Sequence, residues 1–264
     1  MNKMNFNNTP IDWDQVHGVI EEASRIMLTT HENPDGDGLG SQCGLYHHLN
    51  EINKEVRIIN YSPLPVEYEN LNVDRIFETY NESEHNDWME STDLVIIFDV
   101  GDFVRIRTIV DAIEKYSLKT MNMDHHPHPD NHPFTYNLVD LSAAATGCMV
   151  YDYLQVARDK PIVKKSLEGI YTAVMTDTGC FRYSNTNNKC HEIAIECLNI
   201  GVETHIIYQR VYENSTISRM ELMGEFLSNL NYELEGCLAW FVITQDMMNQ
   251  ANATKADVEG FSDM

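Results

Sequence analysis

Short apolar runs alternate with amphipathic stretches along the first part of the chain, and this alternation constrains the fold more than any other feature. The clearest run is DLVIIFDV (93–100), a continuous apolar segment of the kind that parallel sheets bury on both faces. Further strands are expected at 27–31, 55–62 and 117–126. Helices are expected over 11–26, 38–52, 87–91 and 106–117. This order indicates βαβ units, so the chain is predicted to be α/β, with a mostly parallel sheet flanked by helices.

From residue 146 onward the sequence becomes mainly helical in period. Helices are expected over 146–159, 164–179, 191–202, 203–214 and 217–234, followed by a strand at 237–245 and a helix at 245–257. The helix around 203–220 is interpreted as a connector, which gives a catalytic domain of residues 1–202 and a second piece of residues 221–264. About 45 residues are too few to build a good core alone. The second piece is therefore expected to be the start of an incomplete, truncated α/β domain.

The composition narrows the partners that the chain is expected to have. With 18 basic and 41 acidic residues, the formal charge is −23, so the chain is not expected to bind long duplex DNA by its general field. No apolar run is long enough for a membrane span, and the polar N-terminus does not resemble a signal peptide. A cytoplasmic protein with no membrane partner is expected. Its six cysteines form no C-x-x-C pair and are interpreted as reduced, mostly buried thiols.

The loop HENPDGDG (31–38) places His31, Asp35 and Asp37 within seven positions. A calcium-binding EF-hand does not fit, because Leu39 and Tyr46 would occupy two of its ligand positions. A simple turn remains an alternative, since Pro-Asp-Gly is common turn chemistry. The loop follows an expected strand, however, and ligands gather at the carboxyl ends of strands in open α/β sheets. Metal binding and a surface turn are both open at this point.

Three other segments place acids or histidines at the ends of expected elements. Asp99 ends the run DLVIIFD, MDHHPHPDNHP (123–133) follows a strand, and Asp177 ends an apolar helix. Each has a plain alternative: an acid that caps the next helix, an adventitious metal-binding loop, or an ordinary helix end. Together they deliver Asp and His to one edge of the sheet, a donor set that suits Mn²⁺, Fe²⁺, Co²⁺ or Zn²⁺ better than Mg²⁺ alone. So many donors indicate two ions that share a carboxylate.

The four motifs, in order, resemble those of the DHH phosphoesterases. These are H-x-x-x-D-x-D, a strand-terminal Asp, D-H-H, and a later Asp in T-D-T-G. The resemblance covers about residues 12 to 190, and TDTGCFRYSNT looks most like the branch of bacterial oligoribonucleases (nanoRNases) that also dephosphorylate 3′-phosphoadenosine 5′-phosphate. It implies a metal-dependent hydrolase with two divalent ions, expected to be Mn²⁺, with Mg²⁺ or Co²⁺ as alternatives. It also implies short RNA oligonucleotides or phosphorylated nucleotides as substrates.

The resemblance assigns a role to each matching residue. One ion would be bound by His31 and Asp35, and the second by Asp37, His125 and Asp177. Asp99 would bridge the two ions. His126 would contact the substrate phosphate or protonate the leaving oxygen, and Asp124 would orient the histidine pair from behind. Arg182 is a further candidate for a phosphate contact, with a surface salt bridge as its alternative.

The sequence departs from this branch in one respect. The branch carries a second domain ending in a glycine-rich G-G-G-H segment that contacts the substrate, and no G-G-G-H occurs here. The expected function is hydrolysis of these substrates by metal-activated water. Two alternative functions remain: a pyrophosphatase or polyphosphatase of the same superfamily, or a catalytically impaired metal- or nucleotide-binding protein that lacks the G-G-G-H segment. An incomplete domain would also expose an apolar edge near 237–245, which makes a homodimer an alternative to a monomer.

Overall fold

The computed structural model describes residues 4–5, 10–129, 131–258 and 261. The chain divides into two compact units, one up to Arg210 and one from Val211 onward. The division lies within the segment expected to connect two domains. No helix in the described part of the chain is long and apolar enough to cross a membrane.

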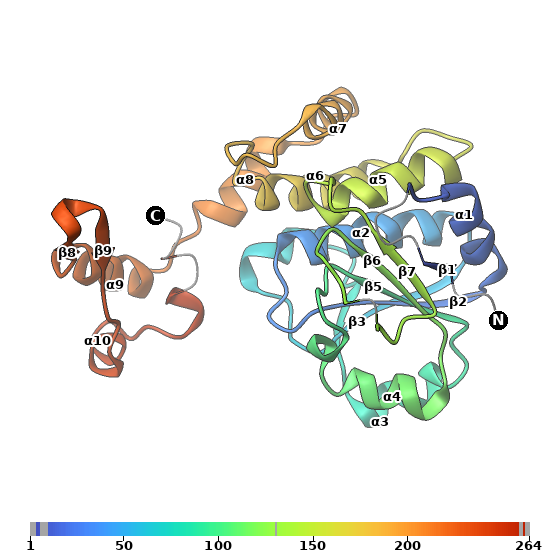
Figure 1. The fold of residues 1–264 in the computed structure, drawn as a ribbon, viewed down its shortest axis with the longest axis horizontal. Helices are drawn as coiled ribbons and strands as arrows, with labels where there is room; N and C mark the ends of the chain where they lie inside the picture. Colours follow the sequence, from blue (N-terminus) through green and yellow to red (C-terminus); the bar gives the residue numbers. More distant parts are fainter. Residues whose placement is uncertain (1–3, 6–9, 130, 259–260, 262–264) are drawn as a thin grey trace. The chain divides into compact units, whose positions relative to one another are not determined.

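The first unit is built on a seven-stranded sheet in the order β1-β7-β6-β5-β2-β3-β4, in which every strand pairing is parallel (Figure 1). The strands are β1 (Met4–Asn5), β2 (Arg25–Thr30), β3 (Glu55–Asn60), β4 (Phe77–Thr79), β5 (Leu94–Phe98), β6 (Thr120–Asp124) and β7 (Tyr136–Val139). The predicted parallel α/β fold is therefore confirmed. Strands β1, β4 and β7, which lie outside the predicted set, are short and carry polar residues, so they show little apolar patterning.

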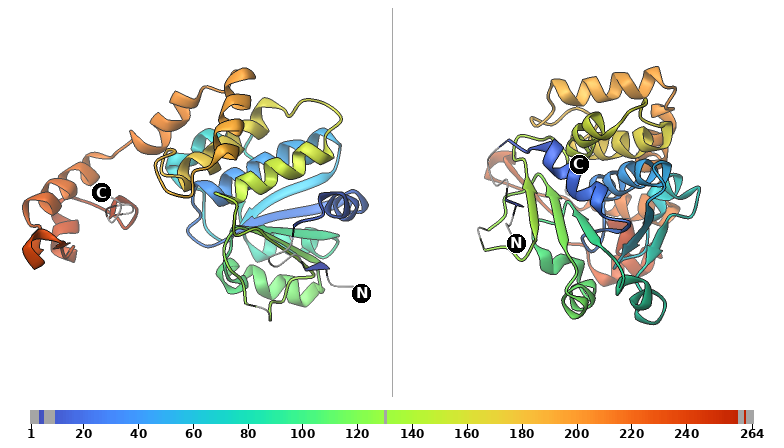
Figure 2. Two further views of the ribbon diagram at one scale, coloured as in Figure 1. Left: turned by 45° about the horizontal axis from the view of Figure 1, so that its top comes forward. Right: turned by 90° about the vertical axis from the view of Figure 1, so that its right-hand side faces the viewer.

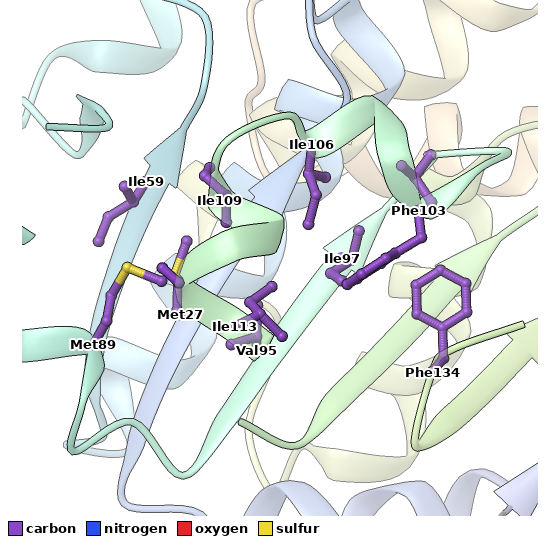
Figure 3. Close-up of a cluster of buried hydrophobic side chains, with 12 residues drawn as sticks. Met27, Ile59, Met89, Val95, Ile97, Phe103, Ile106, Ile109, Ile113 and Phe134 are labelled. Atoms are coloured by element: carbon purple, nitrogen blue, oxygen red, sulfur yellow. The ribbon is translucent and has the colours of Figure 1, made fainter. Parts of the chain in front are cut away.

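Helices cover both faces of this sheet, which explains why all five residues of the central strand β5 are buried (Figure 1). One face is covered by α3 (Glu82–Met89) and α4 (Ile109–Tyr116), with the short helical turn η2 (Phe103–Ile106). Figure 3 shows Val95 and Ile97 of β5 packed with Ile109 and Ile113 of α4 in one apolar cluster. Alternate residues of a strand point to opposite faces, so Leu94, Ile96 and Phe98 face the other helical layer.

The other layer contains α1 (Trp13–Glu22), α2 (Gly36–Glu51), α5 (Thr146–Ala157) and α6 (Lys164–Asp177), as Figures 1 and 2 show. Helices α2 and α6 approach so closely that a Cβ added at Gly40 would lie 2.4 Å from the carbonyl oxygen of Gly169. A Cβ at Gly169 would lie 2.6 Å from the carbonyl oxygen of Gly40. Glycine at both positions is therefore a steric requirement of this helix pair. Helices α7 (Asn188–Asn199) and α8 (Thr204–Tyr212) follow.

The helices expected over 203–214 and 217–234 are separate, as predicted, whereas the interpretation of 203–220 as a single connecting helix is wrong. Helix α8 ends at Tyr212, and a new helix, α9 (Ile217–Ser228), begins after Thr216. The Thr216 side chain accepts a hydrogen bond from the backbone N–H of Arg219 and so caps α9. The polar segment Asn214–Thr216 consists of residues that favour caps over helix interiors, and this local preference breaks the helix.

The second unit has a small apolar core of its own, formed by Leu222, Ala251 and Phe261. It contains α9, α10 (Gln245–Gln250), and an antiparallel pair of strands, β8 (Asn231–Glu233) and β9 (Leu238–Trp240). The expected helix 217–234 ends at Ser228, and the expected strand 237–245 is only three residues long. Every residue of the two strands is exposed.

Candidate metal centre

The loop HENPDGDG places its donors through the start of helix α2. The Asp35 carboxylate caps this helix by accepting hydrogen bonds from the backbone N–H groups of Asp37 (3.0 Å) and Gly38 (3.2 Å). Asp37 lies within the first turn and is fully buried, and its carboxylate accepts hydrogen bonds from the N–H groups of Thr146 (2.7 Å) and Gly147 (2.9 Å) at the start of α5. The same loop therefore forms the turn that begins helix α2 and supplies two of the clustered acids.

His31 and His125 each direct one ring nitrogen toward carboxylates. Nε2 of His31 lies 3.8 Å from Asp35 and 3.7 Å from Asp99. Nε2 of His125 lies 3.6 Å from each of three carboxylates, those of Asp37, Asp99 and Asp177. The six residues predicted as metal ligands thus form two adjacent groups that meet at Asp99.

The second nitrogen of each ring is held by the backbone. Nδ1 of His31 is 2.7 Å from the carbonyl oxygen of Glu32, and Nδ1 of His125 is 3.2 Å from that of Ala143. Donation from Nδ1 leaves the Nε2 lone pair available to a ligand. The buried Nε2 of His125 has no hydrogen-bond partner among the described residues. An unpartnered imidazole nitrogen among three carboxylates fits a divalent cation, and sets of His31, Asp35 and Asp99 and of Asp37, His125 and Asp177 are close enough to hold one each.

Asp99 follows β5 in an unusual backbone conformation, with φ at +51°. Few residues other than glycine adopt this left-handed region, although aspartate tolerates it better than most, and such conformations concentrate at functional sites. Burial acts to raise the pKa of Asp99, but contacts with His126 and His31 outweigh it and lower the pKa to about 2. The Asp99 carboxylate is therefore charged at neutral pH and lies between the two groups.

Two other acids of the cluster, the buried Asp37 and the partly buried Asp177, have the opposite tendency. Burial, followed by repulsion from Asp99 and Asp177, raises the pKa of Asp37 well above its ordinary value. Burial also raises the pKa of Asp177 to about 6. Burial lowers the pKa of His31, but its contacts with Asp35 and Asp99 dominate and raise it to about 9. The cluster therefore retains protons at neutral pH that a cation would have to displace.

Asp124 and His126 form a separate hydrogen-bonded pair beside the cluster. Oδ1 of Asp124 accepts hydrogen bonds from Nδ1 and from the backbone N–H of His126, both at 2.9 Å. These contacts with Asp124, and then with Asp99, raise the pKa of His126 to about 10. About half of the His126 side chain is exposed, so a charged imidazole is accessible at the edge of the cluster.

Asp124 was expected to orient both histidines of the D-H-H motif, and the structure corrects this. Asp124 holds His126, whereas the backbone carbonyl of Ala143 holds His125. The other oxygen of Asp124 accepts from Nε2 of His128 at 2.8 Å. His125 and His126 lie in the bend that follows β6, and their rings are held by different groups. The sequence analysis gave His128 no role, and its position in the His-rich loop was the only sign that it lies near the site.

Two arginines differ in their relation to the cluster. Arg182 is exposed, makes no ion pair among the described residues, and donates from Nε to the carbonyl of Gly179 at 2.9 Å. The surface salt bridge that was the alternative for Arg182 is thus not seen among the described residues, and its phosphate contact stays a prediction. Arg105, which had no assigned role, places one guanidinium nitrogen 3.1 Å from Nδ1 of His31 and the other 3.2 Å from the carbonyl of Val100. It lies on the η2 turn, where no periodic sequence pattern distinguishes it.

Comparison with known proteins matches residues 25–176 to the model of the DHH family, N-terminal domain. The chain belongs to the DHH family. The matched region includes five of the six clustered residues and ends one residue before Asp177. The family predicted from the four motifs is confirmed, and the chain is a phosphoesterase, as predicted.

Several DHH-family relatives have known names. A Thermus thermophilus protein named bifunctional oligoribonuclease and PAP phosphatase NrnA is 27% identical over 90% of this chain and 70% of its own length. The Bacillus subtilis protein of the same name is 28% identical over 88% of this chain and 70% of its own length. These are the branch that the motifs were predicted to resemble.

Solved structures share the fold. An exopolyphosphatase-related protein from Bacteroides fragilis superimposes with a TM-score of 0.88 and 27% identity, covering 96% of this chain and 75% of that one. A putative family II inorganic pyrophosphatase from Methanococcus jannaschii has a TM-score of 0.55 at 14% identity, covering 78% of this chain and 66% of that one. At that identity the second likeness concerns the fold alone.

Proposed function

We propose that this DHH protein hydrolyses short oligoribonucleotides and 3′-phosphoadenosine 5′-phosphate, using two divalent metal ions. The observation that carries the proposal is the position of Asp99, whose two carboxylate oxygens lie toward different histidines. Oδ2 is 3.7 Å from Nε2 of His31, and Oδ1 is 3.6 Å from Nε2 of His125. One carboxylate shared by two donor groups is the arrangement that a two-metal site requires. The substrate class follows from the names of the Thermus and Bacillus relatives.

The proposed ligands are divided between two ions. His31 and Asp35 would hold the first, Asp37, His125 and Asp177 would hold the second, and Asp99 would contact both. When bound, the ions would lower the pKa of a water molecule and offset the negative charge of the phosphoryl group. The proposed ions are Mn²⁺, with Co²⁺ or Mg²⁺ as alternatives, because imidazole and carboxylate donors can bind each of these divalent ions.

His126 would supply the proton for the leaving oxygen. Its Nδ1 is engaged by Asp124, so the exposed remainder of the ring is free to approach a substrate. The raised pKa keeps the imidazole protonated at neutral pH, so the ring carries both a proton for the leaving oxygen and a positive charge for the phosphate. Asp124 acts through His126 by holding its ring and its charge.

A test compares three substrates and two matched variants. The chain with Mn²⁺ is assayed against 3′-phosphoadenosine 5′-phosphate, a diribonucleotide and pyrophosphate. Asp99→Asn should lower kcat/KM for the first two by at least about 10³-fold. Asp102→Asn changes the exposed acid of the same loop, which caps the η2 turn, and should retain activity.

Each alternative outcome contradicts a different part of the proposal. Turnover of pyrophosphate alone would replace the substrate class with the one suggested by the polyphosphatase-related structure. Equal activity in Asp99→Asn and the wild type would exclude the shared-carboxylate site. Metal binding without turnover of any substrate would mean that the chain is a binding protein.

A further inference from the structure

A cavity of about 220 Å³ lies among the ends of α2 and α6 that are remote from the metal centre. It is lined by the C-terminal part of α2, the segment 158–163 and the first turn of α6. His48, which lines it, is 11 residues beyond Asp37 on α2, or about 16 Å along the helix axis. The cavity and the metal centre are therefore separate sites on the same helix pair.

Two buried polar side chains that line this cavity each carry an atom for which the described residues supply no hydrogen-bond partner. They are Ser166, whose side chain is fully buried, and His48, which is 8% exposed. Neither Oγ of Ser166 nor Nε2 of His48 has a partner among the described residues. Buried polar groups are almost always paired, so two unpaired groups from different helices beside one cavity point to a ligand.

The cavity also contains the start of α6, which has no capping side chain. Val163 occupies the N-cap position, so the first-turn N–H groups lack the acceptor that Ser, Thr, Asp or Asn would supply. Helix N-termini of this kind attract anions. The first turn carries Lys164 and Lys165 instead of the acids that would stabilise it.

Basic residues are concentrated at this point of a strongly acidic chain. Four of its 18 Lys and Arg residues lie between positions 158 and 165. Arg158 pairs with Glu196 at 3.1 Å, Lys164 with Glu168 at 3.7 Å, and Lys165 with Asp74. Lys160 makes no ion pair in the part of the chain that the structure describes, and it lines the cavity. Its ammonium is therefore available to a ligand.

We propose that this cavity binds a small tetrahedral oxyanion of the phosphate class. The first-turn N–H groups of α6, the hydroxyl of Ser166 and the ammonium of Lys160 would donate to its oxygens. Burial lowers the pKa of His48, so this ring is neutral and would contribute a single N–H. Glu51 and Asp159 also line the cavity, and their charges would disfavour a polyanion such as an oligonucleotide. The ligand is therefore a small, compact anion.

Inorganic phosphate is the probe, titrated by calorimetry into the full chain after EDTA treatment, with acetate at equal ionic strength for comparison. The wild type should bind phosphate at one site, at least about tenfold more tightly than acetate, because a tetrahedral ion accepts from more donors. Lys160→Gln and Ser166→Ala should each weaken phosphate binding by at least about fivefold. Ser166→Ala removes a hydroxyl for which the described residues supply no partner, so this variant should keep the wild-type Tm.

Two controls separate this cavity from the metal centre and from general charge. Asp99→Asn alters the metal centre and should bind phosphate as the wild type does. Lys119→Gln removes an exposed lysine elsewhere on the surface and should also have no effect. The proposal is overturned if phosphate does not bind, if acetate binds equally well, or if Asp99→Asn abolishes binding that Ser166→Ala retains.

Discussion

The close contact between α2 and α6 is expected to set the geometry of the candidate metal centre. A Cβ at Gly40 would lie 2.4 Å from the carbonyl oxygen of Gly169 and 2.8 Å from the backbone nitrogen of Ala173. Ordinary contacts begin at 3.4 Å, so Gly40→Ala requires the helices to separate by about 3.4 − 2.4 = 1.0 Å. Both obstacles are backbone atoms, which cannot rotate away as a side chain does.

Overpacking of this kind costs about 1 to 3 kcal/mol of unfolding free energy. The matched control is Gly18→Ala on α1, where an added Cβ meets nothing within 4 Å. There the substitution should stabilise the protein by about 0.5 to 1 kcal/mol, because alanine is the better helix former. Urea denaturation of the metal-free proteins should therefore show opposite changes for the same chemical substitution.

The same displacement should weaken metal binding. Asp37 lies on α2 one turn before Gly40, and Asp177 ends α6 one turn after Ala173. Both carboxylates are 3.6 Å from Nε2 of His125, so a shift of about 1 Å would disrupt their shared geometry. Calorimetric titration should show at least about tenfold weaker Mn²⁺ binding, with kcat lower by about 10²-fold. The reasoning is refuted if Gly40→Ala is as stable as Gly18→Ala, or if it loses stability but binds Mn²⁺ normally.

Two further predictions concern the charges of the centre. Asp124→Asn removes the buried charge that holds His126 and His128, so it should lower the free energy of unfolding by about 3 kcal/mol in urea titrations. It should also lower the pKa of His126, measured by NMR. An unchanged His126 pKa would contradict the pairing of His126 with Asp124. Because the pKa of Asp177 is raised to about 6 and that of His31 to about 9, the folded metal-free protein binds the extra protons, so its stability should fall as pH rises through these values. Mn²⁺ should displace the His31 proton, so the affinity for Mn²⁺ should rise by up to about tenfold per pH unit between pH 7 and 9. Calorimetry at pH 7.5 in two buffers of different ionisation enthalpy should detect the released proton. An Mn²⁺ affinity that does not depend on pH would show that His31 is not a ligand.

The parts of the fold that could be predicted from the sequence are those with strong local patterns. The buried run of β5 and the amphipathic helices between strands indicated a parallel sheet, and a parallel sheet brings strand ends to one edge. Strand β7 could not be predicted in this way, because Tyr136–Val139 is short and half polar. The helical periods over 203–214 and 217–234 predicted the break before Ile217, but the interpretation of 203–220 as one connecting helix ignored it.

Contacts between segments that are distant in the sequence could not be predicted from local patterns. Gly40 and Gly169 are 129 residues apart, and nothing in the sequence around either one indicates that the two backbones touch. The contact between the Ala143 carbonyl and His125 was equally unpredictable, because every residue has a backbone carbonyl that could make it. The ligand types were predictable because chemistry restricts them to Asp and His, whereas the groups that orient them are not restricted in this way.

Asp99 and Asp124 show why a carboxylate's role is decided by its neighbours. Both acids are buried at the ends of adjacent strands, and both have a lowered pKa. Asp124 accepts hydrogen bonds from the N–H groups of Val100 (2.9 Å) and Gly101 (2.7 Å) as well as from two histidines. Its oxygens are thereby saturated with donors, and no lone pair is left for a cation. Oδ1 of Asp99, by contrast, accepts no hydrogen bond from the described residues. Nδ1 of His126 is 3.1 Å from this oxygen but donates to Asp124 instead. By engaging His126, Asp124 leaves Asp99 available to metal.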